Sequence, residues 1–137
     1  SGIVSDAFIE GLGPIAEGVL AFREGAPLDK LPGGQMFTEQ YRKQNYGEPP
    51  EAYGAFAFAA ANLIIDAVEK VGPDRKKVMQ ELNNTRDHQS IVGPVTFDDH
   101  GQNSVALITK FVVQDGKWTV WEDSEYASGK RTLARAR

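Results

Sequence analysis

Apolar residues in the middle of the chain recur at the spacing of helices. Within residues 36–46, Phe37 and Tyr41 form an aromatic pair at i, i+4, which predicts an amphipathic helix. Residues 53–71 carry alanine and large apolar side chains on almost every side, with few polar breaks. A helix that is apolar on most sides is packed between layers, so we expect residues 53–71 to be buried.

Shorter elements flank these two helices. Ser5 and Asp6 offer capping oxygens before a short apolar run, and Gly11 and Gly13 would end a helix there. The apolar residues within 17–22 form a short run, and the segment that follows them is rich in glycine, proline and charged residues. The remaining predicted elements are a buried strand over 17–22, an exposed linker over 23–34 and a helix over 74–83.

In the last third of the chain, apolar and polar residues alternate with the period of strands. The alternation covers residues 95–97 and again residues 105–113. Asp115 and Gly116 then lie between alternating apolar residues, which is the strongest short-range signal for a two-residue hairpin turn. Helices followed by an antiparallel hairpin indicate an α/β or α+β unit.

Composition is that of a globular domain. The 137 residues are 41% hydrophobic and 25% charged, which suffices for one core and excludes a disordered chain. No uncharged apolar stretch is long enough to span a bilayer. The start at Ser1 has no basic segment followed by an apolar run, so we expect no signal peptide within this chain. Absence of cysteine excludes thiol chemistry and fits an exported bacterial protein, with a cytosolic origin as the alternative.

The charge is unevenly distributed. The net charge is −4, and without the four basic residues of the last eight positions the remainder carries −8. An acidic body argues against nucleic acid as a partner. We interpret the basic tail as a solvated terminus, with a docking element as the alternative. Its residues are Lys130, Arg131, Arg135 and Arg137.

Sites of chemistry are scarce. His88 and His100 lie in polar, turn-like segments, and we interpret both as exposed loop residues, with a metal or catalytic role as the alternative. Residues 98–103 lack the ligand spacing of a calcium loop and indicate a tight turn in which Asx side chains bond the backbone. Residues 11–16 match a dinucleotide fingerprint, but no apolar strand precedes them. We therefore expect no enzyme activity, metal or cofactor.

Two aromatic residues mark the start of the helix over 53–71. Tyr53 stands at its expected first position, and Phe56 lies one turn further. Aromatic side chains beside the unpaired N–H groups of a helix start line small-molecule clefts. Packing in the core is the alternative for each of them.

Six groups of residues occur in a specific order along nearly the whole chain. They are Gly2-Ile3-Val4-Ser5 with Ala16-Glu17-Gly18-Val19; Phe37, Tyr41, Tyr46-Gly47, Pro50 and Tyr53; Phe58-Ala59-Ala60; Asp74-Arg75 with Val78; Gly93-Pro94-Val95-Thr96-Phe97-Asp98 with Gly101; and Val113-Gln114-Asp115-Gly116-Lys117. In this order the chain resembles the carboxy-terminal portion of the type I periplasmic solute-binding proteins, specifically the leucine/isoleucine/valine-binding group.

The resemblance implies an α/β fold of the periplasmic binding protein type I class, of which this chain is a part. Two lobes of that fold close on a ligand like a hinged clamp. About residues 1–22 would belong to lobe 2, about 23–103 to lobe 1, and about 104–137 would cross back to lobe 2. The implied function is the substrate-binding component of an ABC transporter, which captures a small branched-chain type amino acid in the bacterial periplasm and delivers it to the permease.

The resemblance also implies ligand-binding residues. Tyr53 matches an aromatic that contacts the ligand side chain, and Phe56 is the aromatic one turn on. Ser1 falls where amino-acid binders carry the acidic residue that pairs with the ligand ammonium, which a serine does not neutralise. Either Ser1 is not a native residue, or the ligand is an aromatic or aliphatic carboxylic acid without an amino group.

Two other classes of function remain as alternatives. Related folds serve as ligand-sensing domains of receptors or regulators. A partial fold also has exposed strand edges, so self-association of the fragment is the further alternative.

Overall fold

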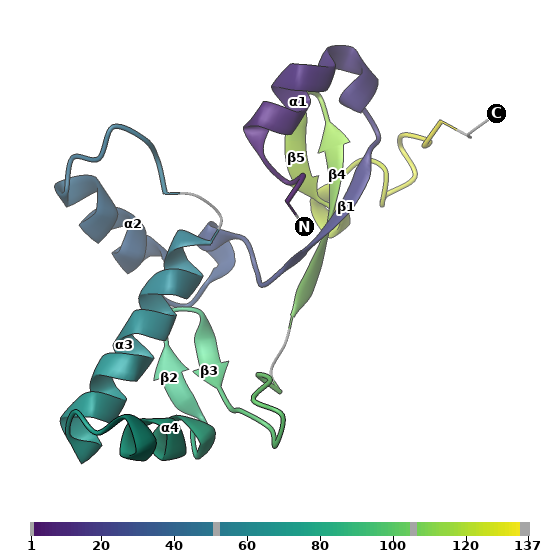
Figure 1. Cartoon of the computed structure of the whole chain (residues 1–137). Coiled ribbons are helices and arrows are strands. Elements are labelled where there is room, and N and C mark those ends of the chain that lie inside the picture. Colours follow the sequence, from purple (N-terminus) through teal and green to yellow (C-terminus); the bar gives the residue numbers. More distant parts are fainter. Residues whose placement is uncertain (1, 51–52, 105–106, 135–137) are drawn as a thin grey trace. The chain divides into compact units, whose positions relative to one another are not determined.

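The structure is a computed structural model that describes residues 2–50, 53–104 and 107–134. The chain divides into two compact units: unit 1 is Ser1–Gly25 with Leu107–Arg137, and unit 2 is Ala26–Ala106 (Figure 1). The chain therefore leaves unit 1 once and returns to it. In the described residues, no helix is both long and apolar enough to cross a membrane.

Unit 1 is built on a three-stranded antiparallel sheet in the order β1-β4-β5. The strands are β1 (Leu20–Glu24), β4 (Ile108–Gln114) and β5 (Lys117–Val120). Helix α1 (Asp6–Leu12) packs on one face of this sheet, where the ring of Phe8 lies 5.6 Å from that of Trp118. The indole N–H of Trp118 also donates to the carbonyl of Ser5 at 3.0 Å. A 3-10 turn, η1 (Gly13–Ala16), follows α1, and another, η3 (Trp121–Asp123), follows β5.

The hairpin predicted in unit 1 is confirmed. Asp115 and Gly116 have φ values of 54° and 72°, which is the left-handed pair that a two-residue turn of type I′ requires. The strand predicted over 17–22 is displaced, because Glu17 and Gly18 form a turn with Gly18 at φ 79° and β1 begins only at Leu20. Its predicted burial is also wrong, since successive side chains of β1 point to opposite faces and only Ala21 is buried.

Unit 2 combines three helices with a small hairpin. The helices are α2 (Gly34–Lys43), α3 (Gly54–Val71) and α4 (Arg75–Asn83), and the hairpin joins β2 (His88–Ser90) to β3 (Gly93–Val95). A 3-10 turn, η2 (Leu28–Lys30), precedes α2, so the segment expected to be a linker is partly ordered into elements. The core of the unit is Leu31, Phe37 and Ala55, with Ile91 and Val92 packed against it.

Helix α3 is less buried than its sequence predicts. Only Ala55, Ala59 and Ala67 are buried, whereas Ile64 and Ile65 keep 49% and 52% of their surface exposed. The prediction of burial on most sides is therefore wrong for the described residues, because only the side of the helix that carries Ala55, Ala59 and Ala67 is buried.

The tight turn predicted over 98–103 is confirmed. Oδ1 of Asp98 accepts from the backbone N–H groups of His100 and Gln102, both at 2.9 Å. Oδ1 of Asn103 accepts from the N–H of Thr96 at 3.1 Å, and Phe97 pairs with Asn103 across the turn. These oxygens are engaged by the backbone of the turn, as the Asx interpretation requires.

Candidate functional site

The start of α3 carries two of the three residues predicted to bind a ligand. Tyr53 directly precedes the helix and has 47% of its surface exposed, and its carbonyl accepts from the N–H of Ala57 at 3.0 Å. Phe56 follows within the first turn and is half-buried. The third residue, Ser1, lies outside the described residues. The structure thus brings Tyr53 and Phe56 to one helix end, with an accessible aromatic at the tip.

An aromatic cluster of Phe37, Tyr41, Tyr46 and Phe58 holds this helix end in place. The Phe37 ring lies 5.9 Å from Tyr41 and meets Phe58 edge-on at 5.6 Å, while the Tyr41 and Tyr46 rings are 4.9 Å apart. Such tilted and edge-on pairs are the favoured geometries of aromatic contacts. The pair at i, i+4 in α2 is therefore confirmed, and its consequence is that the start of α3 is packed against α2.

Gly54, the first residue of α3, lies next to the ring of Phe37. A Cβ atom on Gly54 would lie 3.4 Å from the ring of Phe37, at the tight end of van der Waals contact. The backbone that follows Tyr53 thus lies directly on the Phe37 ring. The start of α3, where Tyr53 lies, therefore contacts α2.

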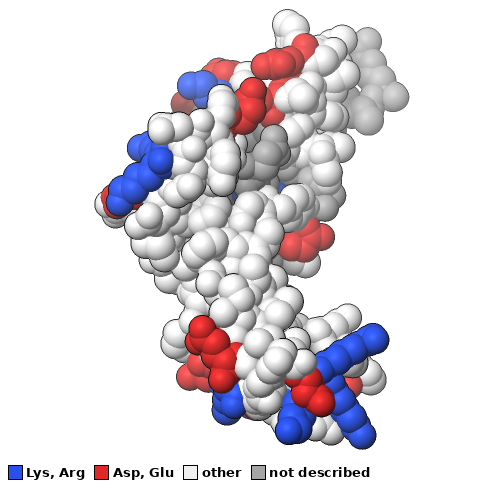
Figure 2. Space-filling model, turned by 60° about the vertical axis from the view of Figure 1, so that its left-hand side comes forward, with Lys and Arg blue, Asp and Glu red and all other residues white. Residues whose placement is uncertain are grey.

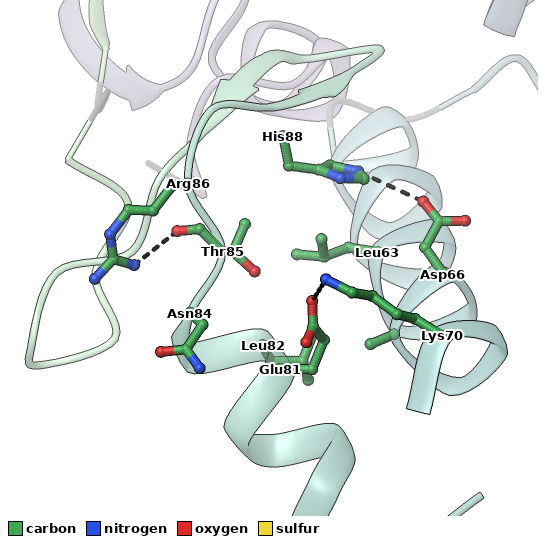
Figure 3. Close-up of a pocket in the computed structure, with 10 residues that line it drawn as sticks. Leu63, Asp66, Lys70, Glu81, Leu82, Asn84, Thr85, Arg86 and His88 are labelled. Atoms are coloured by element: carbon green, nitrogen blue, oxygen red, sulfur yellow. Dashed lines mark hydrogen bonds and ion pairs between the residues drawn. The ribbon is translucent and has the colours of Figure 1, made fainter. Parts of the chain in front are cut away.

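A second feature is a groove between α3, α4 and β2. It consists of two hollows of about 300 and 520 Å³ that share Asp66 and His88 in their walls. Figure 3 shows the smaller hollow, in which Lys70 and Glu81 point toward each other and Asp66 points toward His88. Lys70 and Glu81 form an ion pair, and Nε2 of His88 lies 3.7 Å from Oδ2 of Asp66.

Two of the charged side chains that line this groove, Lys70 and Glu81, are paired with each other, whereas Arg86 is bonded to backbone carbonyls. Arg86 points away from Asp66 and donates to the carbonyl of Thr85 at 2.8 Å (Figure 3). Among the residues that the structure describes, no group of three or more His, Asp or Glu side chains could hold a metal ion. The interpretation of His88 as an exposed loop residue is wrong: it lies in β2 and its side chain is only 28% exposed. His100, by contrast, is an exposed turn residue as expected.

This groove is not evident from the sequence, because it is formed by side chains from separate elements. Asp66 and Lys70 stand at i, i+4 on α3, and that spacing is visible in the sequence. Their partners Glu81 and His88 come from other elements, so only the packing of α3 with α4 and β2 reveals the pairing.

The surface of unit 2 carries charges of both signs. Acidic and basic side chains gather together at the lower end of the face in Figure 2, over α4 and the end of α3. No extended patch of one sign lies on this face among the described residues. On the face shown in Figure 2, charges of both signs therefore lie side by side at this end of the unit.

The basic tail of the chain is not simply solvated. The guanidinium of Arg131 bonds three carboxylates, from Glu17, Asp115 and Glu125. The interpretation of the tail as a solvated terminus is therefore wrong at Arg131, although Lys130 is exposed. Arg135 and Arg137 lie outside the described residues.

Comparison with known proteins identifies the fold. The model of the family described as periplasmic binding protein matches residues 1–117. The structure is similar to that of the leucine-binding protein LivK of Thermotoga maritima, with a TM-score of 0.72 and 26% identity over 87% of this chain and 34% of that one. A putative branched-chain amino acid ABC transporter protein of Rhodospirillum rubrum is also 26% identical, with a TM-score of 0.60 over 85% of this chain and 34% of that one.

A third similar structure shows the same fold at lower identity. It is the branched-chain amino acid transporter substrate-binding protein LivJ of Streptococcus pneumoniae in complex with isoleucine. Its TM-score is 0.71 at 18% identity, over 85% of this chain and 33% of that one. No match was found among curated proteins.

The chain spans about a third of the length of the solved structures it matches. Helices and strands are mixed along it. The expectation of a partial α/β fold of the type I class is thereby confirmed. The chain belongs to the periplasmic binding protein family.

Proposed function

We propose that this chain is part of the substrate-binding component of an ABC transporter, which captures a small amino acid of the branched-chain type in the periplasm and delivers it to the permease. The observation that carries the proposal is the family match over residues 1–117, together with the similarity to a leucine-binding protein. Since solute-binding proteins work by closing on a ligand, we propose no covalent chemistry.

Assignment of the two units to two lobes is part of this proposal. Unit 1 would belong to lobe 2, and unit 2 to lobe 1. The division at Gly25 and again at Leu107 supports it, because a chain that crosses twice between compact units provides the connections that a hinge needs. The lobe boundaries that we propose from the resemblance are about residue 22 and about residue 103.

Tyr53 is the proposed contact with the ligand side chain, and Phe56, in the first turn of α3, is the second proposed ligand-binding residue. The exposed ring at the start of α3 and its fixed backbone support this role, because an aromatic on a rigid element adds apolar contact at low entropic cost. By the resemblance, Ser1 stands where amino-acid binders carry the acidic residue that pairs with the ligand ammonium group. A serine there favours ligands in which that group is absent, which makes aromatic or aliphatic carboxylic acids the second candidate class.

Ligand titration of the intact protein tests these proposals. Leucine, isoleucine and valine form one panel, and benzoate and short aliphatic acids form the other. Both tryptophans of the chain, Trp118 and Trp121, lie in unit 1, so their fluorescence reports changes in that unit. Saturable binding of the branched-chain amino acids supports the transporter proposal as stated. If only the carboxylic acids bind, they are the ligand class instead. Binding of neither panel would overturn both.

A ligand-sensing role is the alternative function. Uptake of radiolabelled ligand by cells that lack the gene separates the two. Loss of uptake supports transport, whereas unchanged uptake with a lost transcriptional or behavioural response supports sensing.

A further inference from the structure

Residues 121–131 lie along the face of the unit 1 sheet that α1 does not cover. Side chains of β4 alternate between the two faces, so Lys110, Val112 and Gln114 share one face. Nζ of Lys110 lies 3.5 Å from the centre of the Trp121 ring, and Oε1 of Gln114 accepts from the N–H of Glu125 at 2.8 Å. Between these two contacts, Val112 is fully buried.

The same segment is folded on itself. The hydroxyl of Ser124 donates to the carbonyl of Trp121 at 2.6 Å and accepts from the N–H of Ala127 at 3.1 Å. Ser124 is itself buried, with 4% of its surface exposed. The segment is thus a compact strap and not an extended tail.

Arg131 closes the far end of this segment. Its Nη2 donates to both carboxylate oxygens of Asp115, at 2.8 and 3.0 Å, its Nη1 donates to Glu17 at 3.1 Å, and its Nε donates to Glu125 at 2.6 Å. Every nitrogen of the guanidinium therefore bonds a carboxylate, and the three carboxylates come from separate segments. An isolated surface ion pair contributes little, but a network around one planar guanidinium has fixed geometry.

Tyr126 adds a further connection to the same place. Its hydroxyl donates to Oε1 of Glu17 at 2.7 Å, the oxygen that also accepts from Arg131. Glu17 and Asp115 lie within the residues matched by the family model, while Glu125, Tyr126 and Arg131 lie beyond them. Tyr126 and Arg131, which lie outside the family match, are therefore bonded to two turns that lie inside it, at Glu17 and at Asp115.

We propose that residues 121–131 form a strap that closes over the sheet of unit 1, and that Arg131 is its ionic clasp. With the clasp closed, the strap covers Val112. With the clasp open, the strap detaches as a unit while the sheet beneath keeps its own hydrogen bonds. This device is independent of the proposed ligand and of the transporter function.

Hydrogen exchange of the intact protein without ligand tests the proposal. Arg131→Gln removes the clasp, and Lys130→Gln removes the same charge from the neighbouring exposed position as the matched control. In Arg131→Gln, we expect the amides of residues 121–131 to exchange about tenfold faster or more, with no change in Lys130→Gln. The N–H of Val113, which donates to the carbonyl of Val19 at 3.0 Å, should stay protected in both and thereby report an intact sheet.

Two further measurements test whether the effect of Arg131→Gln comes from the loss of its ionic contacts. Raised salt should speed exchange of the strap in the native protein and have little effect in Arg131→Gln, because the ionic network is then already gone. Asp115→Asn should add little to Arg131→Gln in the double variant if the two side chains act through one contact. Unchanged exchange of the strap in Arg131→Gln, or an equal effect in Lys130→Gln, would overturn the proposal. Loss of protection at Val113 together with the strap would also overturn it, since the strap would then not open by itself.

Discussion

Gly34 lies against the backbone of Leu28 so closely that a Cβ atom on residue 34 would sit 1.7 Å from the carbonyl oxygen of Leu28. Its N–H also donates to the carbonyl of Leu31 at 3.0 Å, which closes η2 onto the start of α2. A methyl group at this position has no space, because the atom that it meets belongs to the backbone. Glycine at the first residue of α2 is therefore a requirement of packing.

Gly34→Ala should destabilise the protein even though alanine is the better helix former. Helix propensity favours alanine by about 0.5–1 kcal/mol, whereas forcing the backbone of Leu28 aside costs about 1–3 kcal/mol or more. Denaturant unfolding measures the difference. Gly47→Ala is the control, because nothing lies within 4 Å of its Cβ position. Equal stabilities of the two variants would contradict the packing argument.

Asp74→Ala should lower the free energy of unfolding by about 1 kcal/mol, because the side chain of Asp74 caps the N-terminus of α4. Its Oδ1 accepts from the N–H of Lys77 at 2.9 Å at the start of α4. Ser5 occupies the same position before α1 but its side chain makes no capping bond. Ser5→Ala is therefore expected to change stability by less than about 0.5 kcal/mol. A larger loss in Ser5→Ala than in Asp74→Ala would refute this assignment of the caps.

Gly116→Ala should weaken the β4-β5 hairpin by about 1 kcal/mol, since a Cβ is disfavoured at its φ of 72°. Gly11 provides the opposite case: it lies inside α1 with open space around its Cβ position. Gly11→Ala should stabilise by about 0.5–1 kcal/mol. Thermal unfolding of both variants checks the sign. A destabilised Gly11→Ala would show that α1 requires glycine for another reason.

Tyr126 should titrate later than an ordinary tyrosine. Its hydrogen bond to Glu17 raises the pKa of the phenol, because ionisation breaks that bond and places two negative charges side by side. A raised pKa in the folded state means that the contribution to stability is fully present below about pH 10, the ordinary tyrosine value, and is lost as the pH rises through the folded pKa. Phenolate absorbance against pH measures this. The late titration should vanish in Tyr126→Phe, and Glu17→Gln should move it down.

Tyr53→Ala should weaken ligand binding about tenfold or more if the ring contacts the ligand side chain. Phe22→Ala is the control, because Phe22 is an exposed aromatic of unit 1 that belongs neither to the proposed contact nor to the aromatic cluster. Calorimetric titration of the intact protein, with circular dichroism to verify folding, provides both readouts. If Tyr53→Ala and the native protein bind the ligand with equal affinity, Tyr53 does not contact the ligand. The family assignment does not depend on this result.

Local features of this protein follow from its sequence alone. The hairpin turn at Asp115 and Gly116, the Asx turn at Asp98 and the aromatic pair of Phe37 and Tyr41 each depend on neighbours within a few residues. Backbone preference and side-chain spacing determine such features before any tertiary contact forms. The order of the short motifs in the sequence also indicated a periplasmic solute-binding protein, and the family match confirms that resemblance.

Features that depend on distant segments required the tertiary structure. The charge pattern of the tail predicts solvation, yet Arg131 bonds Glu17, which is far away in sequence. His88 has the sequence context of a loop, yet it faces Asp66 on α3. The apolar surface of α3 predicts burial, but how much is covered depends on which other elements are present to pack on it. Periodicity specifies which face of an element is apolar, while only the packed fold decides what, if anything, covers that face.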